Sequence, residues 1–425
     1  MIKRVNLFVF VLFIALGSIK GQNLTSSPYS YFGIGDIEQI NNGQTQGLGG
    51  TGIGIVNKYH LNLKNPASYA SFDTLSFKFE FGAKSKFTTL KTNTATEKID
   101  DFGLSFLAMG FPITKKWHTS IALLPMSSVG YKIKDAYEHD EIGNVEHIYT
   151  GEGGLNQLML GNSFKINNNF AIGLNASYTF GKLTYYKALL FSDLSASANS
   201  IYESKLNVKG FSYQFGMQYN LKVLEKYNVA MGFTFDNQSN LSIEKHIVAG
   251  STFNTYTDFL LSSTIYDTIF SENTKGDLII PTKIGMGFSV TDNNHFIAAI
   301  DYEIQQWEDS EILGINSGLA NYSRLSGGLE YTPIRNHPKF FRRLNYRIGG
   351  NYSNSYLTIN NTQLSSYGVN FGIGVPVRRT KTSFNINFEY GQRGTTENNL
   401  IKENYAIISL TLSLSDIWFY KRKYD

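Results

Sequence analysis

Between residues 75 and 419 the sequence alternates apolar and polar side chains with a period of two, in fourteen separate segments. This period places successive side chains on opposite faces of a β-strand. The connections between the segments are alternately long and short, which is typical of membrane barrels with long outer loops and tight periplasmic turns. The pattern therefore predicts an all-β protein: a 14-stranded antiparallel transmembrane barrel in the outer membrane of a Gram-negative bacterium.

The N-terminus predicts export from the cytoplasm. Lys3 and Arg4 precede a short apolar run at residues 5–16, and small residues follow it. Such a run is too short to span a bilayer and is typical of a cleaved signal peptide, which we assign to residues 1–22. The chain contains no cysteine, which excludes a lipid-anchored N-terminus and disulfides.

Residues 23–74 do not alternate, although they precede the first predicted strand. They are rich in Gly, Asn and Ser, as in YSYFGIGD at 29–36 and GLGGTGIGI at 47–55. A segment of this composition buries too little apolar surface for a domain of its own. We therefore expect residues 23–74 to plug the lumen, residues 75–420 to form the barrel, and residues 421–425 to form a basic periplasmic tail.

Several features together resemble the FadL-type family of outer-membrane transporters for long-chain fatty acids and other hydrophobic compounds. They are the Gly-rich segment, the Asn65-Pro66-Ala67 motif before the first strand, and fourteen strands. Weaker matches occur in the same order along the chain: GGLNQLMLG at 153–161, DYEIQQWED at 301–309 and RLSGGLEYTP at 324–333. The resemblance implies an N-terminal hatch, with Asn65, Pro66 and Ala67 as its motif, in a barrel that passes hydrophobic molecules.

Pro125 lies in the middle of the third predicted strand. Proline cannot donate to a β-ladder and is expected at an edge, a bulge or a break. FadL-type barrels are interrupted in this strand, where substrate leaves sideways. The resemblance thus implies a lateral gap at Pro125, Ser127 and Ser128, and the alternative is a bulge without an opening.

Two predicted outer loops, 186–204 and 240–276, contain more apolar residues than water-exposed loops need. Exposed apolar surface often marks a binding site, and FadL-type proteins collect their ligand between these two loops. The alternative is that the loops pack on each other or extend the strands. The predicted ligand-binding residues are Leu189, Leu190, Phe191, Phe253, Phe259, Leu260 and Leu261.

Charged residues also occur within the predicted strands. Charge is destabilising on the lipid face, so these side chains are expected to point into the lumen. Opposite signs on neighbouring strands predict ion pairs that brace the wall and hold the plug. The predicted lumen network is Asp301, Arg324, Glu330, Arg347 and Glu389.

No set of residues predicts an enzyme. The G-x-G-x-x-G match at 47–52 lacks the flanking strand and helix that dinucleotide binding requires. Acidic and histidine residues at 139–147 are more typical of a solvated loop than of a metal site. We expect no catalytic residue, no metal, no cofactor and no nucleic-acid partner.

Two functions remain open. In the first, the barrel binds hydrophobic small molecules, such as fatty acids, and passes them into or across the outer membrane. In the second, a non-transporting FadL-like barrel is a subunit of an outer-membrane protein assembly or secretion complex. The partners are membrane lipids and lipopolysaccharide in both, with hydrophobic small molecules in the first and other outer-membrane or periplasmic proteins in the second.

Overall fold

The computed structural model describes residues 25–417, except 142, 192–198, 224–225, 253–266, 293–294, 317, 336 and 379. The predicted signal peptide and the basic tail lie outside the described residues. Within the described part, no helix has the length and hydropathy needed to cross a bilayer.

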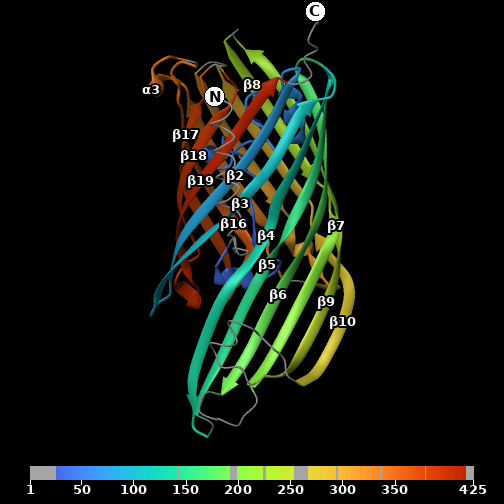
Figure 1. Cartoon of the computed structure of the whole chain (residues 1–425), viewed down its shortest axis with the longest axis vertical. Coiled ribbons are helices and arrows are strands. Elements are labelled where there is room, and N and C mark those ends of the chain that lie inside the picture. Colours follow the sequence, from blue (N-terminus) through green and yellow to red (C-terminus); the bar gives the residue numbers. More distant parts are fainter. Residues whose placement is uncertain are drawn as a thin grey trace, which may run out of the picture.

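Fourteen antiparallel strands form a closed wall around a central plug (Figure 1). The wall closes where the last strand pairs with the first, from Ile417 opposite Ser76 to Lys402 opposite Lys91. In order around the barrel the strands are β2 (Ser76–Lys91), β3 (Thr96–Pro112), β4 (Trp117–His139), β5 (Gly143–Lys165), β6 (Phe170–Phe191), β7 (Asn199–Val223), β8 (Tyr227–Asp236), β11 (Lys283–Thr291), β12 (Phe296–Gln305), β15 (Tyr322–Tyr331), β16 (Asn345–Ile359), β17 (Thr362–Pro376), β18 (Ser383–Arg393) and β19 (Lys402–Ile417). The predicted fold is confirmed.

The two faces of the wall follow the alternation in the sequence. In β18, Phe384 and Ile386 are almost half exposed, whereas Asn385 and Asn387 between them are buried. The exposed apolar set faces the bilayer, and the buried polar set faces the plug. Because both termini of the barrel and the tight turns lie at one end, that end is the periplasmic one for a barrel of this kind.

At the other end, the strands from β4 to β7 continue beyond the rest of the wall (Figure 1). Two further strands, β9 (Ser239–Thr252) and β10 (Asp267–Ile280), join this extension. The outer half of β7 pairs with β9, while its periplasmic half pairs with β8. Much of what we predicted as the outer loops 186–204 and 240–276 is therefore strand, in β6, β7, β9 and β10. These long connections form strands because their apolar residues pack together in a core of the extension, made of Ile148, Ala188, Leu190 and Ile201.

The plug, residues 25–75, contains four short elements. They are η1 (Pro28–Tyr31), β1 (Asp36–Ile37), η2 (Gln46–Leu48) and η3 (Pro66–Ser71). The remaining short elements lie in connections: η4 (Trp307–Asp309), β13 (Glu311–Ile312), β14 (Ile315–Asn316), α3 (Phe340–Arg343) and η5 (Glu397–Asn399).

Candidate functional site

The plug packs into the barrel through two apolar clusters. Its N-terminal part contributes Tyr29 and Ile34 to a core that includes Trp307 and the outer halves of several wall strands. Its C-terminal part contributes Tyr69 and Phe72, among others, to a second core against β3, β4 and β5. Apolar packing therefore holds both the N-terminal and the C-terminal part of the plug against the wall.

Asn65, in the Asn-Pro-Ala motif, connects the plug to itself and to the wall. Its Oδ1 accepts a hydrogen bond from the Ala67 N–H at 3.0 Å, which caps the N-terminus of η3. Its Nδ2 donates to the carbonyl oxygens of Ile53 at 3.0 Å and Met217 at 3.1 Å. The ring of Pro66 lies over Gly216 in β7, where a Cβ would come within 3 Å of it. In this structure the motif is a structural joint between the plug and the wall.

The plug backbone approaches the wall closely where two wall strands lack side chains. Gly232 in β8 and Gly287 in β11 face each other across the ladder. A Cβ on Gly232 would lie 2.0 Å from the Ile53 carbonyl oxygen, and one on Gly287 would lie 2.5 Å from the Gly54 nitrogen. Beside them, Asp301 Oδ2 accepts hydrogen bonds from the backbone N–H groups of Gly52 at 2.6 Å and Ile53 at 2.8 Å.

Buried charges make further connections between plug and wall. Lys64 of the plug pairs with Glu303 of β12 at 3.2 Å, and both side chains are almost fully buried. Arg324 donates to the Gly49 carbonyl oxygen at 3.0 Å. The Lys64–Glu303 pair was not predicted, because Lys64 lies in the irregular segment, which has no period that indicates where its side chain points.

Arg347 and Glu330 form the most buried of these ion pairs, at 2.6 Å. Arg347 also donates to the Gly43 carbonyl oxygen at 3.2 Å, and Glu330 accepts from Gln44 at 3.0 Å, so both charges reach the plug. Glu389, the remaining member of the predicted network, instead accepts from Asn370 within the wall at 2.8 Å.

The wall is interrupted between β3 and β4. Their pairing runs from Pro112 opposite His118 only as far as Leu107 opposite Leu123. Beyond that point β4 continues to pair with β5, with a register shift at Pro125. Residues 96–106 of β3 pair with β2 but with no described residue of β4. The use of this interruption as a lateral exit remains a prediction.

The plug occupies the position where the β3–β4 ladder is missing. In β1, Asp36 and Ile37 pair with Ser128 and Ser127 of β4, and the Glu38 N–H donates to the Met126 carbonyl oxygen at 2.9 Å. On the other side, Ser26 donates from its N–H and Oγ to the carboxylate of Asp101 in β3, at 3.1 and 2.5 Å. We call residues 25–38 the strap, because they bridge the two edges of the interruption.

The strap is also bound to β18, three strands from β3 along the wall. Asp36 Oδ1 accepts from Arg393 of β18 at 2.7 Å, and its Oδ2 accepts from Thr25 at 2.7 Å. Burial raises the pKa of the Asp36 carboxyl, but the positive charges of Arg393 and Lys86 outweigh it and hold that pKa below its ordinary value. Sequence reasoning missed this anchor, because YSYFGIGD contains only one charge and no periodicity.

Two cavities in the lumen reach Pro125. One, of about 140 Å³, has Lys64, Lys283 and Glu303 in its lining. The other, of about 230 Å³, has Arg393 and Glu403 in its lining. Ligand pockets for apolar molecules are lined predominantly by hydrophobic side chains. The first cavity also has apolar lining residues, among them Met126, Met159, Leu241 and Ile280, so charged and apolar side chains together line the space beside the wall interruption.

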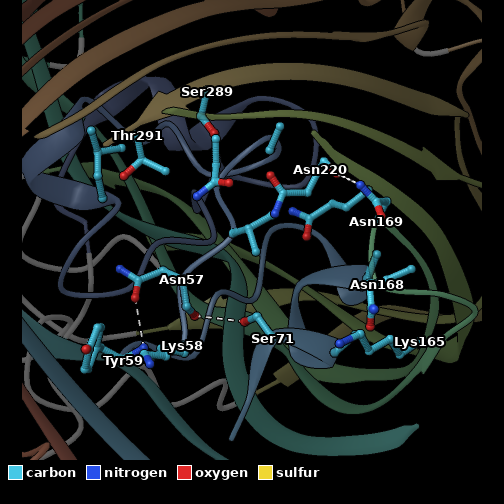
Figure 2. A pocket seen from close by; sticks show the side chains of 18 of the residues that line it. Asn57, Lys58, Tyr59, Ser71, Lys165, Asn168, Asn169, Asn220, Ser289 and Thr291 are labelled. Atoms are coloured by element: carbon cyan, nitrogen blue, oxygen red, sulfur yellow. Dashed lines mark hydrogen bonds between the residues drawn. The ribbon is translucent and has the colours of Figure 1, made fainter. Parts of the chain in front are cut away.

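A larger cavity, of about 540 Å³, opens at the periplasmic end of the lumen (Figure 2). Its floor is plug backbone, where Asn57 Oδ1 accepts from the Tyr59 N–H at 2.9 Å and Ser71 Oγ donates to the Asn57 carbonyl oxygen at 3.0 Å. Its rim is rich in amides, including Asn169, which donates to the Asn220 carbonyl oxygen at 2.8 Å. This cavity was not predicted from the sequence, although the three consecutive asparagines at 167–169 could have indicated its polar rim.

The predicted ligand-binding residues are only partly described. Leu189 and Phe191 are half-buried, and Leu190 is buried in the core of the outer extension. Phe253, Phe259, Leu260 and Leu261 lie outside the described residues. The assignment of these residues to a ligand groove stays a prediction.

Residues 139–147 form the end of the β4–β5 hairpin. The His147 ring stacks with the rings of Tyr137 and Tyr149, and Glu146 pairs with Lys134 at 2.9 Å. No group of three or more acidic, histidine or cysteine side chains with metal-binding geometry occurs in the described part of the chain.

Comparisons with known proteins match this chain to one protein family by sequence and to one fold among solved structures. A family model described as BamG matches residues 1–425. No curated protein has a significant match to the sequence.

Among solved structures, a FadL homologue from Pseudomonas aeruginosa aligns with a TM-score of 0.60 at 11% identity, over 90% of this chain and 100% of that one. The toluene transporter TodX from Pseudomonas putida aligns at 0.58 with 15% identity, over 91% and 100%. The toluene transporter TbuX from Ralstonia pickettii aligns at 0.57 with 10% identity, over 88% and 98%. These matches confirm the FadL-type fold, and identities this low establish the fold alone.

Proposed function

The chain belongs to the BamG family along its whole length, and from this premise we propose that it is a non-transporting subunit of a BAM-type outer-membrane protein assembly complex. The match to that family carries the proposal. The FadL-type barrel then serves as a stable membrane scaffold that presents surfaces to other proteins.

The attachment of the plug supports a scaffold. A hatch that moves must break its contacts with the wall in each cycle. Here the plug shares a buried ion pair with the wall at Lys64–Glu303 and a partly buried one at Asp36–Arg393, and its strap pairs with the edge of β4. Separating buried partners leaves uncompensated charges, which is strongly unfavourable. The plug is therefore a permanent part of the wall in this proposal.

The outer extension supplies a surface for a protein partner. In the described part of the chain, residues 267–276 of β10 have β9 on one side and no strand on the other. An open edge presents backbone N–H and C=O groups that accept a strand of another chain. On this strand, Ile269 is 76% exposed and Phe270 is 48% exposed. We propose that a partner subunit contacts this edge on the outer side of the membrane.

Passage of hydrophobic molecules is the second candidate, and the interruption between β3 and β4 is the observation that favours it. A molecule bound near Leu189 and Phe191 would have to displace the strap to leave beside Pro125. The charged groups in both cavities at Pro125 oppose that route, because an apolar molecule there would desolvate them without replacing their hydrogen bonds. The apolar side chains in the first cavity, such as Met126 and Leu241, favour it.

Gentle purification from the native membrane, followed by mass spectrometry, separates the two functions. If the protein is a scaffold, other proteins should co-purify with it in stoichiometric amount. Isolation of the barrel alone with bound apolar molecules would contradict the scaffold role. The variant Ile269→Glu/Phe270→Glu should release an outer partner. The matched control Ile315→Glu changes an isoleucine of similar exposure, at 71%, on β14 and should retain it.

A further inference from the structure

The turn between β15 and β16 departs from the pattern of the periplasmic end. Its neighbours are tight, covering residues 113–116, 166–169 and 377–382, whereas this turn covers residues 332–344 and contains α3. The turn sequence TPIRNHPKFFRRL contains basic residues and no acidic residue. In Figure 1, α3 projects outward from the rim of the barrel.

Hydrogen bonds place α3 on the membrane side of the rim. At the start of β16, Tyr346 and Ile348 are exposed on the lipid face, while Asn345 and Arg347 are buried on the lumen face. The Tyr346 hydroxyl donates to the Phe341 carbonyl oxygen in α3 at 2.9 Å. Because that hydroxyl belongs to a lipid-facing side chain, the helix it holds lies over the bilayer and not over the lumen.

The helix is also fixed internally. The Ile334 N–H donates to the Arg342 carbonyl oxygen at 2.8 Å, which ties α3 to the first part of the turn. The guanidinium of Arg343 lies 5.1 Å from the centre of the Phe340 ring, within range of a cation–π contact. The exposed groups of α3 are thus held in place before any ligand binds.

These groups are apolar and cationic together. Phe341 is 74% exposed and Phe340 is 45% exposed, in a position where water would otherwise surround them. Lys339, Arg342 and Arg343 flank them in the same turn. Aromatic rings at the headgroup level and basic residues beside anionic headgroups are both stabilised at a membrane surface.

We propose that α3 and Lys339 form a binding site for an anionic phospholipid of the periplasmic leaflet. In this arrangement the two phenylalanine rings insert among the acyl chains next to the headgroups. Lys339, Arg342 and Arg343 bind the phosphate group. The site fixes the depth and tilt of the barrel in the membrane, independently of whether the barrel serves a complex or transports.

The first test measures lipid retention. The full-length protein is reconstituted in vesicles of phosphatidylethanolamine with phosphatidylglycerol and then mildly delipidated. Native mass spectrometry measures the phosphatidylglycerol that stays bound. Arg342→Gln/Arg343→Gln should bind phosphatidylglycerol more weakly by about fivefold for each arginine removed. Arg378→Gln removes an exposed arginine from the β17–β18 turn and should retain the lipid. Equal retention by all three proteins, or equal loss in the control, would overturn the proposal.

The second test measures how deeply α3 lies in the bilayer, and it does not depend on lipid charge. The chain already has three tryptophans, so Phe341→Trp is compared with the unsubstituted protein in the same vesicles. The fluorescence that the substitution adds should be quenched by phospholipids that carry bromine near the headgroup. Absence of quenching would place α3 in water and overturn the proposal. If the arginine variant keeps its lipid but loses a protein during native purification, the site belongs to a protein partner instead.

Discussion

Replacing Arg347 with methionine tests whether buried charge pairs hold the plug. The Arg347 side chain is 0% exposed, Glu330 is 3% exposed, and their charged groups are 2.6 Å apart. Methionine leaves the carboxylate with the Gln44 amide as its remaining described hydrogen-bond donor. Breaking a buried pair by removing one partner costs about 3–5 kcal/mol. We expect a loss of that size in the free energy of unfolding.

The loss should favour states in which the plug leaves the wall. At about 1.4 kcal/mol per tenfold, 3 kcal/mol raises the population of such states about a hundredfold. A reporter is available, because the chain has no cysteine and Thr51 of the plug is fully buried. Thr51→Cys in the Arg347→Met background should react with a maleimide about a hundredfold faster than in the native background. Urea unfolding in detergent micelles measures the stability directly.

Two controls make the result specific. Arg378→Met removes an exposed arginine from a periplasmic turn and should change neither measurement. The double variant Arg347→Met/Glu330→Met removes both charges and should recover most of the stability, because an apolar pair of similar volume is often neutral. The reasoning is refuted if Arg347→Met leaves both stability and labelling unchanged, or if the double variant is no more stable than the single one.

Three further predictions concern the plug and its contacts. The pKa of Asp36 in the folded protein lies below its ordinary value, so its bond to Arg393 stabilises the strap fully above an aspartate's usual pKa, about 3.9. That stabilisation is lost as the pH falls through the lower folded pKa. Acid should therefore expose a cysteine introduced into the strap, and Asp36→Asn should remove this pH dependence. Gly232→Ala should keep the plug from packing against the wall, so that the band of folded barrel in unheated samples disappears from gels. Gly327→Ala should fold normally, because its Cβ would lie 3.5 Å from the nearest atom, the Ala299 carbonyl oxygen. Asn65→Ala should cost about 1 kcal/mol for the lost helix cap and more for its two other bonds, measured by urea unfolding, and an unchanged midpoint would contradict its role as a joint.

The outer extension shows where sequence reasoning reached its limit. Ala188 and Leu190 continue the alternation of β6 beyond the length a bilayer needs, and we interpreted that stretch as a loop. Apolar residues in a connection are compatible with a ligand groove, a partner site or a further hairpin. Only Ile148 and Ile201, on the strands next to β6, decide that Leu190 is buried in a sheet.

The barrel could be predicted from the sequence alone. A period of two, an even number of segments, tight turns at one end and inward charges are local properties, since each depends on residues close together in the chain. The sequence also indicated that residues 23–74 are not wall, and that Pro125 is unsuited to an uninterrupted ladder.

The contacts between the plug and the wall could not be predicted from the sequence. The strap fills the interruption beside Pro125, Lys64 reaches Glu303, and the Ile53 carbonyl packs on Gly232. These contacts join residues ninety or more positions apart, and the irregular segment has no period that indicates where its side chains point. The same holds for α3, whose basic and aromatic residues are evident in the sequence. Its position over the bilayer follows from one hydrogen bond to Tyr346.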